Sequence, residues 1–209
     1  MKVPVLFFIF LLIEILTAVV GGFRYRSLPR PLRILEWMII VSIFEVIVQL
    51  TLAYYHIHNT WTMHFITLIE IVFVFLMYSL WIKQRQSRLM LLFCLSAFVV
   101  LWIVSKFTFE PFSLLDGWTA TISMILQIIF STLLLVDVVK ESDIIWTDDP
   151  RFWIATGIII YSAGSLFWFA FFNKMLQISP ERLKQVFYLN WILSIISNLL
   201  YARGFLCKR

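Results

Sequence analysis

The chain has 209 residues, of which 62% are hydrophobic and only 14% are charged, and it contains nine Trp and 21 Phe residues. Soluble domains average about half apolar and about a quarter charged residues, so this composition indicates an integral membrane protein. The net charge of +5 does not indicate nucleic-acid binding, because the basic residues lie in short loops beside apolar segments, where they orient helices in a bilayer.

The first apolar segment follows Lys2 and resembles a secretory signal peptide. However, Glu14 interrupts its apolar stretch, and four arginines follow the segment directly, at positions 24, 26, 30 and 33. Arginines in that place oppose translocation of what comes after them. We therefore expect this segment to stay in the protein as a spanning helix.

Seven segments are long and apolar enough to cross a hydrocarbon core, which takes about 20 helical residues. Gly, Pro and charged residues separate them, and we place the spans at 3–21, 34–55, 61–82, 89–105, 119–139, 152–172 and 185–203. This pattern predicts an all-α bundle of seven transmembrane helices in one domain, residues 1–209. Every loop is short, so a signal would have to pass through a separate protein partner.

The distribution of basic residues predicts the orientation of the bundle. Twelve of the 17 Lys and Arg residues lie after the first, third, fifth and seventh spans, and five lie on the other side. Cytoplasmic loops carry the excess of Lys and Arg. We therefore expect the N-terminus outside and the C-terminus in the cytoplasm.

Three glutamates, Glu14, Glu45 and Glu70, fall near the middle of the first three spans. No Lys or Arg lies at mid-span to pair with them, and an ionised carboxylate at that depth is costly. We expect these groups to be protonated, bound to a cation or exposed to a water-filled cavity.

Other polar residues share helix faces with one another or repeat along a span. With the glutamates, the candidates for binding a ligand, a proton or a cation are Glu14, Glu45, Gln49, Glu70, Gln127, Asn190, Ser194 and Asn198. Hydrogen bonds between helices are the alternative; we favour them for the Ser and Asn residues and a functional role for the glutamates. Gly157 and Gly164, seven residues apart, predict a close helix contact.

The entry to the third span carries His56, Trp61 and His64, which we place at the mouth of such a cavity. A zinc site made of His56, His58 and His64 is the one metal candidate. All three come from one short stretch, and zinc sites need three or four ligands with fixed geometry, so we predict no metal. No nucleotide-binding or hydrolase motif is present, so we predict no cofactor and no catalytic residue.

Two stretches, "HNTWTMHFITLIE" and "DPRFWIATGIIIYSAGSLFWF", resemble motifs of a family of bacterial seven-helix membrane proteins. The matching residues are Asn59, Trp61, His64 and Glu70, then Pro150, Phe152, Trp153, Gly157, Tyr161 and Gly164. The resemblance implies seven spans in a bacterial cytoplasmic membrane and brings no activity with it.

Three functions fit these features. The first is a receptor-like sensor with a polar cavity inside the membrane that relays ligand or pH state to a partner. The second is a small transporter or a proton or cation pathway, and the third is a structural subunit of a membrane complex. Many transporters have internal repeats and helices broken within the membrane. The sequence shows no clear internal repeat and no span broken by proline, so we favour the sensor.

Overall fold

The computed structural model describes residues 4–114, 116–141, 145–175 and 180–207, and within them all side chains except those of 167, 168, 170–175, 180–184 and 186. These residues form seven long α-helices and one short 3₁₀ turn, η1, and no β-strand. The elements are α1 (Val5–Arg24), α2 (Arg30–Tyr54), α3 (Thr60–Trp81), α4 (Arg85–Thr108), α5 (Trp118–Lys140), η1 (Trp146–Asp148), α6 (Pro150–Met175) and α7 (Pro180–Leu206).

The helices follow the predicted segments, and several run past them. Proline sits at the start of α6, where its missing N–H costs nothing, and the Asp149 carboxylate accepts a hydrogen bond from the Arg151 backbone N–H at 2.8 Å. The fourth segment was predicted over 89–105, but α4 ends at Thr108. Lys106, which the sequence placed in a loop, is therefore in the last turn of a helix.

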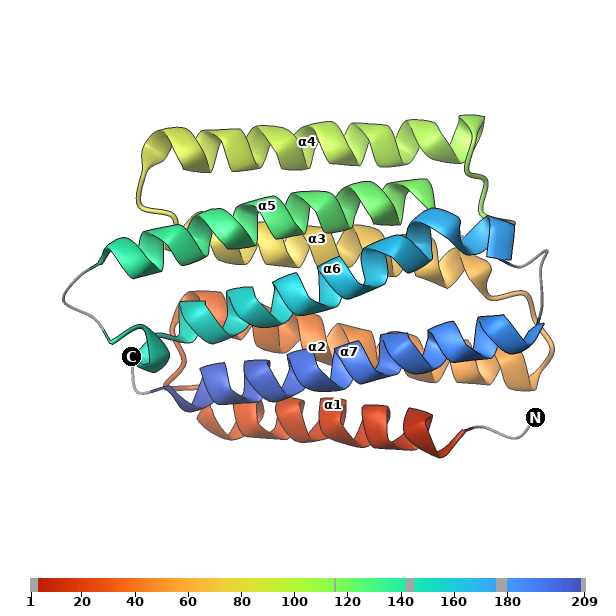
Figure 1. Ribbon diagram of the computed structural model, residues 1–209, viewed down its shortest axis with the longest axis horizontal. Coiled ribbons are helices and arrows are strands. Elements are labelled where there is room, and N and C mark those ends of the chain that lie inside the picture. Colours follow the sequence, from red (N-terminus) through yellow and green to blue (C-terminus); the bar gives the residue numbers. More distant parts are fainter. Residues whose placement is uncertain (1–3, 115, 142–144, 176–179, 208–209) are drawn as a thin grey trace.

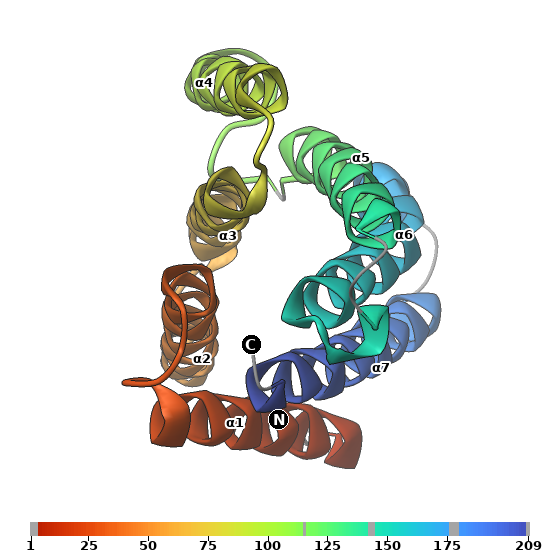
Figure 2. The ribbon, with the colours of Figure 1, turned by 90° about the vertical axis from the view of Figure 1, so that its left-hand side faces the viewer.

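Six helices form a ring, in the order α1, α2, α3, α5, α6 and α7, and α1 closes it by packing against α7. Helix α4 lies outside this ring, against α3 and α5 (Figure 2). Consecutive helices run antiparallel (Figure 1).

The outer surface of the bundle is apolar and much of its buried material is polar. Large side chains such as Phe44, Phe93 and Phe107 are exposed, whereas Glu14, Gln127 and 18 other polar residues are buried among the described residues. Helices α1 to α5 are each long and apolar enough to cross a membrane, judged by length and composition over the described residues. The chain is therefore an integral membrane protein; seven spans, and the sides on which the termini lie, stay predictions.

The two ends of the ring differ. The N-terminal end carries the start of α1 and the connections 55–59 and 109–117, and the basic end carries the connections 25–29 and 82–84 and the end of α7 (Figure 1). Toward the basic end the ring is filled with apolar side chains. The largest fully buried members of this core are Leu32, Leu35, Ile71, Phe75, Tyr78, Phe130, Leu134, Ile154, Ile158 and Phe205.

Candidate functional site

A cavity of about 380 Å³ lies inside the ring, and side chains from all six ring helices line it. Helix α4 contributes none of its described residues. Asn59 and Asp116, from the two connections at the N-terminal end, belong to the lining, so the cavity extends to that end. Its other limit lies about halfway along the ring, near Glu70 and Tyr201, where the apolar core begins. We call the part of the ring that surrounds the cavity the cavity half, and the part filled by the core the basic half.

All eight residues that the sequence suggested for ligand, proton or cation binding line this one cavity. They are Glu14, Glu45, Gln49, Glu70, Gln127, Asn190, Ser194 and Asn198. They come from five different helices, so the fold brings together positions that the sequence could place only on separate faces. Binding itself stays a prediction.

The amide and hydroxyl groups of the cavity wall connect neighbouring helices. Gln127 on α5 accepts a hydrogen bond from Ser162 on α6 at 3.3 Å. Asn190 on α7 donates to Ser165 on α6 at 3.2 Å, and Thr17 on α1 donates to the Asn198 carbonyl at 3.1 Å. These Gln, Asn and Ser residues therefore form hydrogen bonds between helices, which is the alternative role that we expected for such residues.

The carboxyl groups of the wall are less well satisfied. Gln49 donates a hydrogen bond to Glu45, one turn away on α2. Glu14 is 3% exposed, and its Oε2 atom has no hydrogen-bond partner among the described residues; the same holds for Oδ1 of Asp116, which is 1% exposed. A buried polar atom without a partner costs free energy, and both residues belong to the cavity lining.

Gly157 and Gly164 let α6 approach α7 closely. A methyl group at Gly157 would lie 2.7 Å from the Tyr201 ring, and one at Gly164 would lie 2.5 Å from the Leu193 side chain. Both distances are shorter than any ordinary carbon contact, so only glycine fits without movement of the partner. This agrees with the predicted helix contact.

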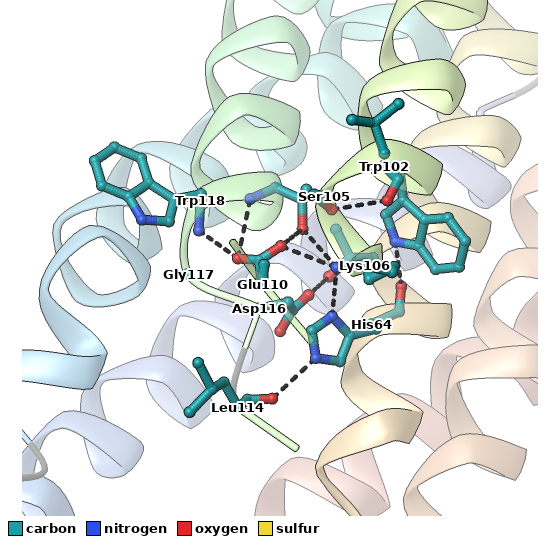
Figure 3. A network of polar contacts seen from close by, with 12 residues as sticks. His64, Trp102, Ser105, Lys106, Glu110, Leu114, Asp116, Gly117 and Trp118 are labelled. Atoms are coloured by element: carbon teal, nitrogen blue, oxygen red, sulfur yellow. Dashed lines mark hydrogen bonds and ion pairs between the residues drawn. The ribbon is translucent and has the colours of Figure 1, made fainter. Parts of the chain in front are cut away.

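A second polar cluster, which we call the loop cluster, lies behind the N-terminal end of the cavity. It consists of His64 on α3, Lys106 on α4, and Glu110 and Asp116 in the connection 109–117 (Figure 3). Thr119 on α5 belongs to it through its hydrogen bond to Glu110. Lys106 Nζ lies 2.9 Å from Glu110 Oε2 and 2.6 Å from His64 Nδ1. Both side chains of the Lys106–Glu110 pair are 2% exposed, so this is a buried ion pair.

The hydrogen bonds assign the protonation of His64. Its Nε2 atom lies 2.9 Å from the Leu114 carbonyl oxygen, which can only accept, so Nε2 carries the hydrogen. Its Nδ1 atom accepts from the Lys106 ammonium group. His64 is therefore a neutral imidazole that connects α4 to the connection 109–117.

Glu110 completes the cluster by capping α5. Its Oε1 atom accepts from the Trp118 backbone N–H at 2.7 Å, and its Oε2 atom accepts from the Thr119 hydroxyl at 2.5 Å. A carboxylate is favourable at a helix N-terminus because the first N–H groups have no partner within the helix. The charged Glu110 carboxylate thus ties the beginning of the connection 109–117 to the N-terminus of α5.

Asp116 joins the loop cluster to the cavity. Asp116 lines the cavity; the Thr67 hydroxyl donates a hydrogen bond to its Oδ2 atom, and its buried Oδ1 atom has no described partner. Burial, and secondarily the nearby Glu110, raise the pKa of Asp116 to about 7. This side chain can therefore gain or lose a proton near neutral pH.

The histidine and tryptophan predictions need correction. His56, Trp61 and His64 are not among the residues that line the cavity. His56 and Trp61 are exposed, and His64 is fully buried but faces the loop cluster. This stretch is polar because it contains the start of α3. The Trp61 ring packs against Phe65 one turn later on the same helix.

The three-histidine zinc candidate is not formed. His58 pairs with the Thr60 hydroxyl at 2.8 Å, and His64 is bound to Lys106 and Leu114. Over the residues that the structure describes, no three His, Cys, Asp or Glu side chains are grouped so that they could hold a metal ion.

Sequence reasoning missed Lys106, Glu110 and Asp116, because all three lie beside a predicted span end and look like ordinary loop residues. The spacing of Lys106 and Glu110, four residues apart, is that of a helical ion pair and was the available signal. Glu36 was also missed; it is 2% exposed and lies in the basic half, outside the cavity.

Comparisons of the chain with protein-family models, with curated proteins and with solved structures find no match.

Proposed function

We propose that this protein is a receptor-like sensor of a bacterial cytoplasmic membrane, which binds a small polar ligand in the cavity and relays its presence to a separate protein partner. One observation carries the proposal: a cavity of about 380 Å³, lined by polar groups from six helices, extends to one end of the bundle only. Ligand sites in proteins have volumes of about 300–1,000 Å³.

The walls of the cavity support a relay. A ligand that bridges the glutamates of α1, α2 and α3 to the amides of α5 and α7 would alter how these helices lie against one another. The same helices continue into the packed basic half, where a change in their positions would be exposed to a partner. We place this end in the cytoplasm, since the excess of Lys and Arg lies there.

A transporter for cations or protons is the second candidate, because carboxyl groups line the cavity. Transport requires the cavity to open to both sides in turn. In a transporter, the helices that enclose the core of the basic half would have to move apart. That core includes Phe75, Tyr78 and Phe205, which are fully buried. This favours a sensor over a transporter, and a purely structural subunit would need no cavity.

The experiment is a thermal-stability screen of the purified protein against small cations, anions and neutral polar compounds. Ala120→Phe, which fills the cavity wall, should abolish stabilisation by a ligand, whereas Ala97→Phe on the exposed face of α4 should not. Absence of any stabilising compound, or equal stabilisation of both variants, would overturn the proposal. Flux of the ligand through proteoliposomes would favour the transporter instead.

A reporter fused after residue 209 tests the orientation in parallel. A cytoplasmic C-terminus is expected, and an external one would reverse the direction of the proposed relay.

A further inference from the structure

The chemistry of the cavity wall restricts its ligand. Four carboxyl groups line the cavity, those of Glu14, Glu45, Glu70 and Asp116, and the described lining includes no Lys, Arg or His. Lys106 lies nearby but is already bound to Glu110 and His64. A positive charge that balances any of these carboxyl groups in its ionised form must therefore come from a bound species.

Two of the carboxyl groups point to a ligand independently of the charge count. Glu14 and Asp116 both line the cavity, and one buried oxygen of each, Oε2 and Oδ1 respectively, has no hydrogen-bond partner among the described residues. Glu14 lies on α1 and Asp116 in the connection that leads into α5, and these two helices lie on opposite sides of the ring (Figure 2). A ligand that satisfies both must reach across the cavity.

The size of the cavity favours an occupant larger than a single inorganic ion. The cavity holds about 380 Å³, more than ten times the ~30 Å³ share of one water molecule in the liquid. The carboxyl groups are dispersed, since no three acidic or other metal-binding side chains are grouped in the described residues.

Aromatic rings form much of the remaining wall. Phe7, Phe10, Tyr161, Trp191 and Tyr201 line it, and the Phe7 and Trp191 rings pack edge to face with their centroids 5.5 Å apart. Aromatic faces attract organic ammonium groups and also accommodate methylene chains. A strongly hydrated metal ion gains little from such a wall.

From these observations we infer that the ligand is a flexible organic polyamine, whose separated ammonium groups pair with Glu14 and Asp116 and whose methylene chain lies on the aromatic rings. The inference deepens the proposed function and rests on it, since it names the ligand class of the same cavity.

The test measures thermal unfolding of the purified full-length protein at constant ionic strength with four probes. Spermidine is the polyamine, 1,8-octanediol and suberate are neutral and anionic compounds of similar length, and Mg²⁺ is an inorganic cation. Spermidine should raise the unfolding temperature in a saturable manner, and the other three should not.

Variants locate the binding. Glu14→Gln and Asp116→Asn should each raise the Kd for spermidine at least tenfold, and Glu45→Gln gives a third, less buried position in case either variant fails to fold. Glu36→Gln is the matched control, because Glu36 also has a buried oxygen, Oε2, without a described partner but lies outside the cavity. Its Kd should change less than twofold.

Several results would overturn the inference. Stabilisation by suberate or octanediol but not by spermidine would show that the cavity binds a ligand that is not a polyamine. The same conclusion would follow if spermidine failed and another compound from the wider screen stabilised the protein. Equal stabilisation by Mg²⁺, or an equal loss in Glu36→Gln, would show that the amine does not act in the cavity. If no compound in either experiment stabilises the protein, the proposed function fails as well.

Discussion

The cavity half and the basic half are built from the same helices but bury their interiors differently. On α3, Glu70 lines the cavity, while Phe75 and Tyr78, five and eight residues later, are fully buried in the apolar core. On α2 the order is reversed along the chain, from Leu32 and Leu35 in the core to Glu45 in the cavity wall. Antiparallel neighbours thus place their polar segments at one end of the ring.

The comparison shows that a buried carboxyl group does not by itself make a site. Glu36 in the basic half is as buried as Glu14, and each has an oxygen without a described partner. Glu36, however, is packed against the backbone of Gly21 on α1, close to the Phe205 ring of α7. Among the described residues, the carboxyl groups with an unsatisfied oxygen that belong to the cavity lining are those of Glu14 and Asp116.

The largest effect is expected from the buried ion pair beside the cavity. Lys106→Met leaves Glu110 charged and without its cation, which costs about 3 kcal/mol for a buried pair. In the basic half Lys83 pairs with Glu141 at 2.8 Å, but the Lys83 side chain is 77% exposed. Lys83→Met should cost less than about 1 kcal/mol, and unfolding in SDS measures both.

A double variant checks the cause of the first result. Lys106→Met with Glu110→Gln should recover part of the stability, because the orphaned charge is gone. A cost equal to or greater than that of the single variant would show that packing, and not charge, is what Lys106 supplies.

The tight packing of the basic half is tested by two adjacent glycines on α1. A methyl group at Gly21 would collide with the Glu36 carboxylate and approach the Phe205 ring to 2.9 Å, whereas one at Gly22 has its nearest contact at 3.7 Å. Gly21→Ala should destabilise by about 1–3 kcal/mol. Gly22→Ala should stabilise by up to about 1 kcal/mol, and the same sign in both would refute this account of the packing.

The two ends should also respond to pH in separate ranges. Burial raises the pKa of Asp116 to about 7 from its ordinary value of 3.8, so its contribution to stability is fully present below about pH 4 and is lost as the pH rises toward 7. Hydrogen bonds from Arg151 and Lys83 lower the pKa of Glu141 to about 2. Its contribution is present above about pH 4.5 and is lost as the pH falls toward 2.

Thermal unfolding as a function of pH checks both contributions. Asp116→Asn should flatten the profile between pH 4 and 7, and Glu141→Gln should flatten it below pH 4.5 only. A profile that Asp116→Asn leaves unchanged would mean that this carboxyl group does not titrate in the range given by its burial.

The smallest effects are expected at the exposed histidines. His56 has a backbone φ of +56°, a conformation that glycine adopts without strain, so His56→Gly should be neutral or slightly stabilising. His58→Gln should change the free energy of unfolding by less than about 0.5 kcal/mol. If Zn²⁺ stabilised the protein and either variant abolished that stabilisation, the result would support the three-histidine zinc site, which the structure does not form.

The sequence by itself determined the class of protein, the approximate limits of its helices and eight of the polar residues that line the cavity. Hydropathy and the spacing of Gly, Pro and Arg mark each helix because a spanning segment must satisfy its own backbone and match the bilayer. Carboxyl and amide groups inside such segments turn away from lipid for the same reason, so Glu14 and Glu70 could be named from their depth in a span and Asn190 from its place on a polar helix face.

Only the tertiary structure decided which helices are neighbours and what each buried charge contacts. Periodicity fixes the inward face of a helix but not the order of helices in a ring, which depends on how side chains far apart in the sequence fit together. That order places α4 outside the ring, brings Lys106 to His64 across 42 residues and puts Asp116 in the cavity wall. It also separates Glu14 from Glu36, two similar carboxyl groups of which one faces a cavity and the other a packed core.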